Sequence, residues 1–157
     1  MQRSPSQFKW VKHIIVADKK SMCLSITITI LKNTHRKDVT TRASVNCGAG
    51  MNCINRGFVK RHNLPQHHLP KPIYTRNVDG YYNEAGLIKF ITTMFIRING
   101  IIHRVLFHII NCGNGNIILG DPWLRKVNPL INWEQRTLEI SEYTDKTHDL
   151  NHQNIKV

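Results

Sequence analysis

The chain has 157 residues, of which 41% are hydrophobic and 20% are charged, and its formal net charge is +12 at pH 7. This length suits one domain with a modest core, and the composition excludes an intrinsically disordered chain. No apolar run is long enough to span a membrane, because charged residues interrupt the longest one, residues 88–110.

The positive charge is spread unevenly along the chain. Residues 1–133 contain 19 of the 22 Lys and Arg but only 5 of the 10 acidic residues, whereas residues 134–157 contain 3 and 5. A basic body can bind nucleic acid or can simply be a solvated surface, and the sequence leaves both open. No Lys/Arg cluster is interleaved with aromatic residues, as a groove for single strands would require.

The first residues favour an intracellular location. Residues 1–6 are polar and basic, and no apolar core of the kind found in signal peptides follows them. We therefore expect a cytoplasmic protein whose four cysteines, Cys23, Cys47, Cys53 and Cys112, are reduced.

The first half of the chain predicts two strands and a short helix. Residues 1–21 predict an N-terminal extension with one weak element. Ordered structure is expected from Met22 onward, and residues 24–30 alternate Leu and Ile with Ser and Thr, which is the period-two pattern of a half-buried strand. A second strand is expected at residues 39–45. A turn of small residues follows at 46–50. Asn55 is then placed to cap a short helix that ends at His62.

The middle of the chain predicts a loop and a long hairpin. Residues 65–77 are rich in Pro and His and predict a loop. Turn residues at 77–80 and 83–86 flank an expected hairpin, and a long strand is expected at 87–98. The tight turn at Asn99-Gly100 is of the primed type and leads into a partner strand that ends at residue 110.

The last third predicts a short strand, a helix and a closing strand pair. Residues 117–119 are wholly apolar and indicate a buried strand. Asp121 is expected to be the N-cap of a helix that ends at Val127, with Pro122 in its first turn. In the strand pair at 131–140, Trp133 and Leu138 are expected to be buried. From Ser141 onward the chain predicts a polar tail. Many short strands with two short helices indicate an all-β, barrel-like domain.

Three separated motifs carry a resemblance to a known family. They are ASVNCGAGMNCINRGFVKRHNL (43–64), VDGYYNEAGLI (78–88) and NIILGDPWLRKVNPLINWEQRTLEI (116–140). In this order they resemble the retropepsin-like aspartic peptidase domain of gypsy-type LTR retrotransposon polyproteins. The resemblance covers roughly residues 22–141 and implies an all-β closed barrel with two short helices. It also implies the family's activity, endopeptidase processing of a polyprotein. A polar, basic extension at 1–21 precedes the domain, and a polar tail at 142–157 follows it.

The resemblance also implies where the catalytic site lies. The family's catalytic Asp falls on Asn46 and the following Ser on Cys47, while Gly48 and Ala49 match the family. The Thr whose hydroxyl ties the two catalytic loops together falls on Gly50. Aspartic peptidases use two carboxylates that share one proton. Because this chain has one such motif, the site would need a homodimer.

Two further segments take roles from the resemblance. Val78, Asp79 and Gly80 correspond to the flap that covers an extended peptide in the cleft. Ile118, Leu119 and Gly120 correspond to the structural strand that precedes the last helix. The resemblance implies no cofactor and no metal.

The amide at residue 46 predicts that catalysis is lost. A carboxamide neither takes a proton from water nor donates one as a carboxylic acid does. We expect no other acid to replace it, because Asp38 lies in a hairpin, Asp79 in the flap turn and Asp121 at a helix start. Cys47 could be a nucleophile only beside a positioned His, and none is near it in sequence. The spacing of Cys47 and Cys53 is unusual for zinc.

Three hypotheses therefore remain open from the sequence. The first is an inactive, retroelement-derived peptidase domain, either decayed or domesticated, located in the cytoplasm or in a retroelement particle. The second is a dimeric module that binds peptides or proteins without cutting them. The third is a basic domain that associates with nucleic acid.

Overall fold

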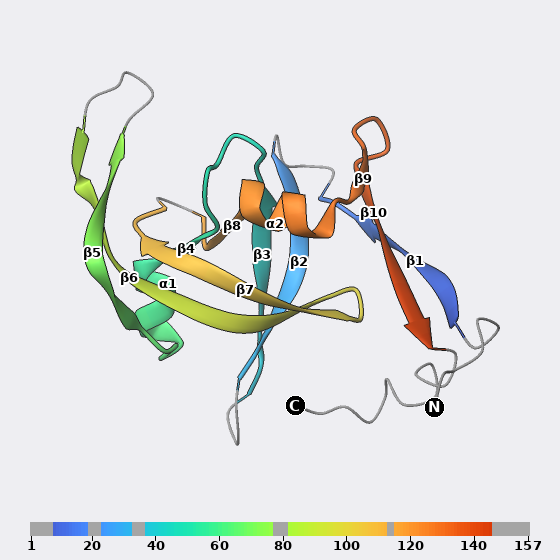
Figure 1. Ribbon diagram of the computed structural model, residues 1–157, viewed down its shortest axis with the longest axis horizontal. Coiled ribbons are helices and arrows are strands. Elements are labelled where there is room, and N and C mark those ends of the chain that lie inside the picture. The colour runs from blue at the N-terminus through green and yellow to red at the C-terminus, as the bar shows by residue number, and fades with distance from the viewer. Residues whose placement is uncertain (1–7, 19–22, 33–36, 77–81, 113–114, 146–157) are drawn as a thin grey trace.

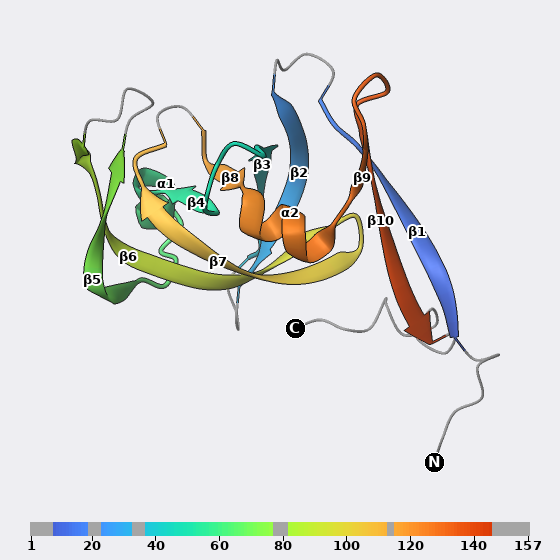
Figure 2. The same ribbon diagram turned by 45° about the horizontal axis from the view of Figure 1, so that its top comes forward.

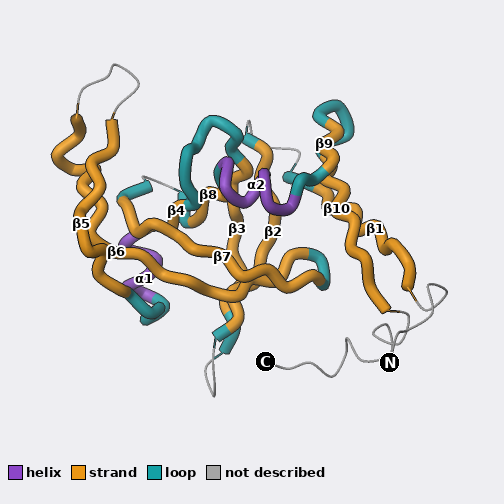
Figure 3. The backbone as a smooth tube through the Cα atoms, viewed as in Figure 1, coloured by secondary structure: helices purple, strands orange, loops and turns teal. Residues whose placement is uncertain are grey.

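The computed structural model describes residues 8–18, 23–32, 37–76, 82–112 and 115–145 (Figure 1). Strands make up most of the described chain, and the two helices are short (Figure 3). No helix in this part of the chain is long and apolar enough to cross a membrane. The elements in chain order are β1 (Phe8–Val16), β2 (Leu24–Leu31), β3 (Val39–Val45), β4 (Cys53–Asn55), α1 (Arg56–Arg61), β5 (His67–Arg76), β6 (Tyr82–Ile98), β7 (Ile101–Ile110), β8 (Ile117–Leu119), α2 (Asp121–Val127), β9 (Leu130–Asn132) and β10 (Thr137–Asp145).

Six strands form a closed barrel. They follow the order β2-β3-β8-β4-β7-β6, and β6 returns to pair with β2. β5 continues the sheet beyond β6 as its edge strand. The expected all-β closed barrel with two short helices is therefore confirmed.

The alternating pattern of β2 fills the barrel interior. Ile26, Ile28 and Ile30 are almost completely buried, while the Ser and Thr between them are partly or fully exposed. Phe107 and Ile109 of β7 and Leu119 of β8 complete the same core. Burial of apolar surface at about 25 cal/mol per Å² is the main term that stabilises such a core.

The turn between β6 and β7 has the expected primed geometry. Asn99 and Gly100 both have positive φ, at 47° and 88°. Two positive φ values match the right-handed twist of the flanking strands. The two strands pair in register from Ile98 and Ile101 to Phe90 and Ile109.

β1 lies in the segment that was expected to be an extension with one weak element. It is a nine-residue strand that pairs with the whole of β10, and Ile15 from it is buried in the core. The sheet β1-β10-β9 projects from one side of the barrel, away from the β5–β6 hairpin (Figures 1 and 2). Two contacts join β1 to the turn between β6 and β7: Asn99 Nδ2 donates to the Ile14 carbonyl oxygen at 3.2 Å, and His13 Nδ1 lies 3.3 Å from the Asn99 carbonyl oxygen.

Two predictions for residues 65–86 were wrong. The segment expected to be a loop at 65–77 is largely the strand β5, and the turn expected at 83–86 lies inside β6. The loop was predicted because of Pro70 and Pro72, since proline is excluded from most strand interiors. Here they fall in a register shift between His68 and Ile73 on an edge strand, where proline is tolerated.

Three predictions near the C-terminal end were also wrong. Trp133 is 61% exposed, because it lies in the turn between β9 and β10 rather than on their buried face. The strand β10 continues past Ser141 to Asp145, where a polar tail was expected. Gly120, not Asp121, is the N-cap of α2, and Asp121 is the first helical residue. Leu138 is fully buried, as expected.

Candidate active site

The turn after β3 is held by backbone hydrogen bonds at both ends. The backbone N–H of Asn46 donates to the carbonyl oxygen of Leu119 at 3.0 Å, and that of Ala49 donates to the carbonyl oxygen of Asn46 at 3.2 Å. Because β3 and β8 run parallel, with Val45 opposite Leu119, the end of β8 supports the start of the turn. The structure thus brings Asn46 together with Leu119 and Gly120, two of the residues expected to be structural.

The side chain of Asn46 stays within its own turn. Its Oδ1 accepts a hydrogen bond from the backbone N–H of Gly48 at 2.9 Å. This is the local bond that Asn and Asp make in turns, so a carboxylate would be accommodated equally well. Asn46, Cys47, Gly48 and Gly50 are all exposed in the single chain.

Gly120 is required by close packing against this turn. A Cβ at residue 120 would collide with the carbonyl oxygens of Ala49 and Met51. The next residue ties the same loop, since the backbone N–H of Asp121 donates to the Ala49 carbonyl oxygen at 2.8 Å. The absence of a side chain therefore lets the end of β8 and the start of α2 lie directly against the turn.

Asn52 is a positioning residue that the sequence analysis missed. It is 6% exposed, and its Oδ1 accepts from the Gly120 backbone N–H at 2.9 Å. Its Nδ2 donates to the Leu106 carbonyl oxygen at 3.4 Å, and its own carbonyl oxygen accepts from the His108 N–H at 2.8 Å. Asn52 thereby joins the turn, β7 and the start of α2. The signal in the sequence was an amide flanked by Met51 and Cys53 in an otherwise apolar approach to β4.

The helix after the turn begins as expected. Asn55 is the N-cap of α1, and its Oδ1 accepts from the Gly57 backbone N–H at 2.9 Å. Phe58 and Val59 of α1 are buried in the core, so the helix anchors the segment that follows the turn. Asn55 Nδ2 also donates to the Gly115 carbonyl oxygen at 3.1 Å.

Two of the acids that the sequence analysis weighed as replacements, Asp121 and Asp38, already bind other groups through their carboxylates. Asp121 was expected to lie away from the turn, but its backbone is in direct contact with Ala49. Its carboxylate forms an ion pair with Arg125 Nε at 2.7 Å, one helical turn along α2. Asp38 precedes β3, at the opposite end of that strand from Asn46, and its Oδ1 accepts from the Lys32 backbone N–H at 3.1 Å.

The four cysteines are free thiols, and the described residues include no group of three or more His, Cys, Asp and Glu that could hold a metal ion. Burial raises the pKa of Cys53 to about 11, and burial together with nearby Cys53 raises the pKa of Cys112 to about 12. Both thiols are therefore protonated at neutral pH. Cys47 is exposed, and no hydrogen bond to a histidine is seen for it in the described part of the chain.

The residues expected to form a flap lie outside the described part of the chain. Val78, Asp79 and Gly80 fall between β5 and β6, the two strands that would carry it, and Gly86 belongs to β6. The paired region of β5 and β6 is described from His67 opposite Ile91 to Arg76 opposite Tyr82.

Comparison with solved structures supports the fold. A retropepsin-like aspartic protease from Rickettsia conorii has a TM-score of 0.57 and 16% identity, covering 87% of this chain and 95% of that one. EIAV protease, in a complex with the inhibitor HBY-793, has a TM-score of 0.51 and 14% identity, covering 72% of this chain and 95% of that one. At these identities the likeness concerns the barrel architecture alone.

Comparison of sequences identifies the family. A search among curated proteins found no match. The family model described as the PEG10/RTL1 protease domain matches residues 42–148, a range that runs from β3 to the end of β10 and includes the Asn46 turn. The chain therefore belongs to the PEG10/RTL1 family of protease domains, which have the retropepsin-like aspartic protease fold.

Proposed function

We propose that this chain is a retropepsin-like protease domain without peptidase activity. Asn46 occupies the position of the catalytic aspartate, and two copies of the chain form a cleft that holds an extended peptide uncut. The observation that carries the proposal is the Asn46 side chain at the end of β3, bound through Oδ1 to Gly48 N–H inside an intact turn.

The chemistry at this turn explains the loss of activity. Aspartic peptidases need one carboxylate to take a proton from water and a second, protonated one to donate to the scissile carbonyl. An amide does neither near neutral or acidic pH. Because a homodimer repeats the substitution, both acids are missing at once. By analogy with the loss of a catalytic triad member, we expect a fall of roughly 10⁴-fold or more in the chemical rate.

The exposure of the turn supports a second copy of the chain as its cover. Asn46, Cys47 and Gly48 face solvent in the single chain. A site that orients water and polarises a carbonyl must exclude bulk solvent, so one copy does not complete it. A two-fold axis beside the turn would bring the two Asn46 side chains together.

The edge strand β5 supports binding of an extended peptide. It ends the strand order of the barrel sheet, and sheet edges bind extended peptides by adding a strand. β5 also leads into the flap region. Peptide binding would thus use backbone groups of β5 and would not depend on the chemistry of Asn46.

Reversion of the turn tests this proposal directly. We expect Asn46→Asp to produce peptide cleavage that pepstatin inhibits, and the combined variant with Cys47→Ser and Gly50→Thr to cleave faster. Residue 50 accepts a threonine, because a Cβ there has no neighbour within 4 Å and the backbone φ is not positive. The measurement is turnover of casein and of a peptide library between pH 4 and pH 7, with the oligomeric state measured by light scattering.

A matched control separates the site from the change in charge. Asn132 is also an exposed asparagine, at the end of β9, and Asn132→Asp makes the same substitution outside the turn. It should leave turnover undetectable. Revertants that are dimeric, folded and inactive would contradict the placement of Asn46, and cleavage by the Asn132→Asp control would contradict it equally.

A further inference from the structure

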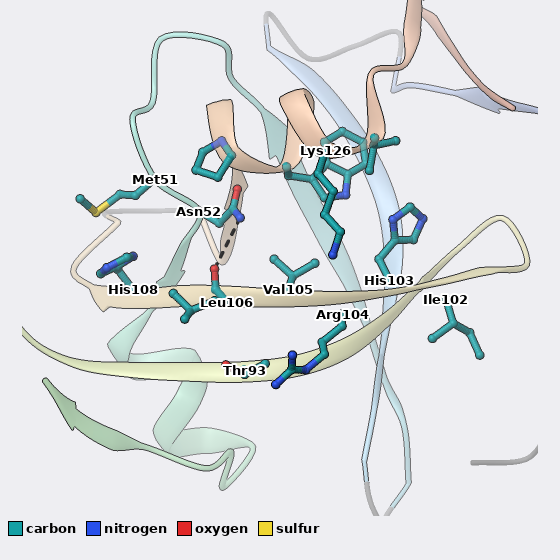
Figure 4. Close-up of a pocket in the computed structure, with 13 residues that line it drawn as sticks. Met51, Asn52, Thr93, Ile102, His103, Arg104, Val105, Leu106, His108 and Lys126 are labelled. Carbon is teal, nitrogen blue, oxygen red and sulfur yellow. Dashed lines mark hydrogen bonds between the residues drawn. The ribbon is translucent and has the colours of Figure 1, made fainter. Parts of the chain in front are cut away.

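A cavity of about 480 Å³ lies between α2 and β7, apart from the Asn46 turn. No residue of 46–50 lines it, and only Met51 and Asn52 from that loop reach its edge. In Figure 4, His103 and Val105 point from β7 toward α2, and the Lys126 side chain extends from α2 into the space between the two elements. The cavity falls within the size range of small-molecule sites.

Three residues that line this cavity each have a buried nitrogen atom without a hydrogen-bond partner. Within the described part of the chain, Trp123 Nε1, His103 Nε2 and His108 Nδ1 are buried and have no partner. Trp123 is only 2% exposed, and its indole N–H can act only as a donor. The rings of His103 and Trp123 have centroids 6.0 Å apart, so two of these nitrogens belong to neighbouring side chains.

The Trp123 indole N–H, which can only donate, favours a ligand that accepts hydrogen bonds. Native structures pair nearly all buried polar atoms, and each exception calls for a specific explanation. Here three exceptions belong to residues that line the same cavity. A bound group with acceptor oxygens would satisfy the Trp123 indole directly.

The charges at the cavity select for an anion. Lys126 and Arg104 are the charged residues of the lining, and none of the 13 lining residues is acidic. Lys126 is close enough to act on His103, because burial and then the Lys126 charge lower the pKa of the imidazole to about 4. The ring is therefore neutral at pH 7 and carries a single N–H, while the positive charge comes from Lys126.

The remaining lining is apolar. Val105 contributes apolar surface from β7, and Pro122 and Val127 contribute apolar surface from α2. Ile102 and Leu106 are 39% and 44% exposed, which is unusual for large aliphatic side chains beside a cavity. Hydrocarbon parts of a ligand would remove this surface from water.

We propose that this cavity binds a small apolar carboxylate. The carboxylate accepts hydrogen bonds from the Trp123 indole N–H and from the Lys126 ammonium, and the hydrocarbon body packs on Val105 and Val127. The proposal concerns a second site and does not depend on whether the Asn46 turn is catalytic.

Nuclear magnetic resonance with defined probes tests this inference. The chain has three tryptophans, so its ¹⁵N-labelled form gives three indole N–H signals, and Trp123→Phe identifies that of Trp123. The probes are phenylacetate, 3-phenylpropionate and 4-phenylbutyrate, each paired with its uncharged amide. We expect at least one acid to shift the Trp123 signal saturably, with the matching amide binding roughly tenfold more weakly or worse.

Two variants of exposed lysines separate the site from general charge effects. Lys126→Glu on α2 should weaken binding of the acid by about tenfold or more. It replaces a charge-assisted donor with a negative charge that repels the carboxylate of the ligand. Lys60→Glu on α1 makes the same change outside the cavity lining and should leave affinity within about twofold.

Three outcomes would overturn the proposal. The first is that none of the acids shifts the Trp123 signal saturably, which would mean that no carboxylate binds at the indole N–H. The second is equal binding of acids and amides. The third is equal weakening by Lys126→Glu and Lys60→Glu, since the interaction would then be with the net charge of the chain.

Discussion

The Asn46 turn and the cavity under α2 lie on two sides of one short connection, Met51-Asn52, and they differ in almost every physical respect. The turn is largely exposed, the backbone N–H groups of Asn46, Gly48 and Ala49 are hydrogen-bonded, and none of its residues from 46 to 50 is charged. The cavity has buried nitrogens without partners and a lysine beside them. The Asn46 side chain makes a turn bond that an aspartate would make equally well, so the hydrogen bonding of the turn does not depend on which of the two stands there.

The residues that support the turn, Gly120 and Asn52, are more constrained than residue 46 itself. Gly120 and Asn52 are buried, and each is fitted to the loop by close packing or by hydrogen bonds. The side chain of residue 46 is exposed and makes one local bond, which Asn and Asp can make equally. We therefore expect exchange of Asn and Asp at residue 46 to have little effect on folding, whereas substitution of Gly120 or Asn52 should lower the free energy of unfolding.

The largest expected effect follows from placing a side chain at residue 120. Gly120→Ala should lower the free energy of unfolding by about 1–3 kcal/mol or more, because its Cβ would overlap the carbonyl oxygens of Ala49 and Met51. The control is Gly50→Ala, which meets no atom within 4 Å and should change stability by about 0.5 kcal/mol or less. Urea unfolding measures both, and equal effects would show that the loop does not lie against Gly120.

A smaller loss is expected when Asn52 can no longer bond. Asn52→Leu leaves the buried Gly120 N–H without its acceptor, which should cost about 1–3 kcal/mol on unfolding by urea. The control is Asn132→Ala, which removes an exposed bond to Gln135 N–H and should cost about 0.5 kcal/mol or less. A loss for Asn52→Leu no greater than the control's would mean that this amide does not hold the turn to α2.

The smallest effect is a dependence of stability on pH that comes from the cavity. The pKa of His103 is lowered from 6.5 to about 4 in the folded chain by burial and by Lys126. Between these values the unfolded chain binds more protons, so the stability contributed by neutral His103 is present above pH 6.5 and is lost as pH falls toward 4. The charged group that acts on this ring is Lys126 from α2, whereas Arg104, the next residue on β7, points away from α2 (Figure 4).

His103→Phe tests this dependence, because it keeps a ring in the cavity and removes the titrating group. The difference in unfolding free energy between pH 7 and pH 5 should be smaller in His103→Phe than in the wild type. His62 and His108 also have lowered pKa values, and both proteins retain them, so the comparison isolates His103. An equal fall in both proteins would contradict the lowered pKa.

The sequence predicted the barrel well because its strongest signals are local. β2, β3 and β8 followed from alternation and apolar runs, and the Asn99-Gly100 turn followed from its dipeptide. β5 was missed because two prolines were tolerated on a sheet edge, which is a property of the whole sheet and not of the segment. Trp133 was misplaced because its exposure depends on how β9 and β10 turn.

The candidate site was predictable only in part. The position of Asn46 at the end of a strand followed from the sequence, whereas its hydrogen bond to Leu119, 73 residues further along the chain, was found only in the structure. Asn52 and the α2–β7 cavity were not predictable, because they depend on side chains from three or more segments meeting in space. No spacing rule relates Trp123 to His103.

The measurement that tests the central claim most directly is peptide cleavage by the wild-type chain, assayed between pH 4 and pH 7 with and without pepstatin. The account predicts no pepstatin-sensitive turnover at any of these pH values, because the turn carries an amide where the shared proton would reside. Pepstatin-sensitive cleavage by purified wild-type protein, abolished by Asn46→Ala, would contradict it.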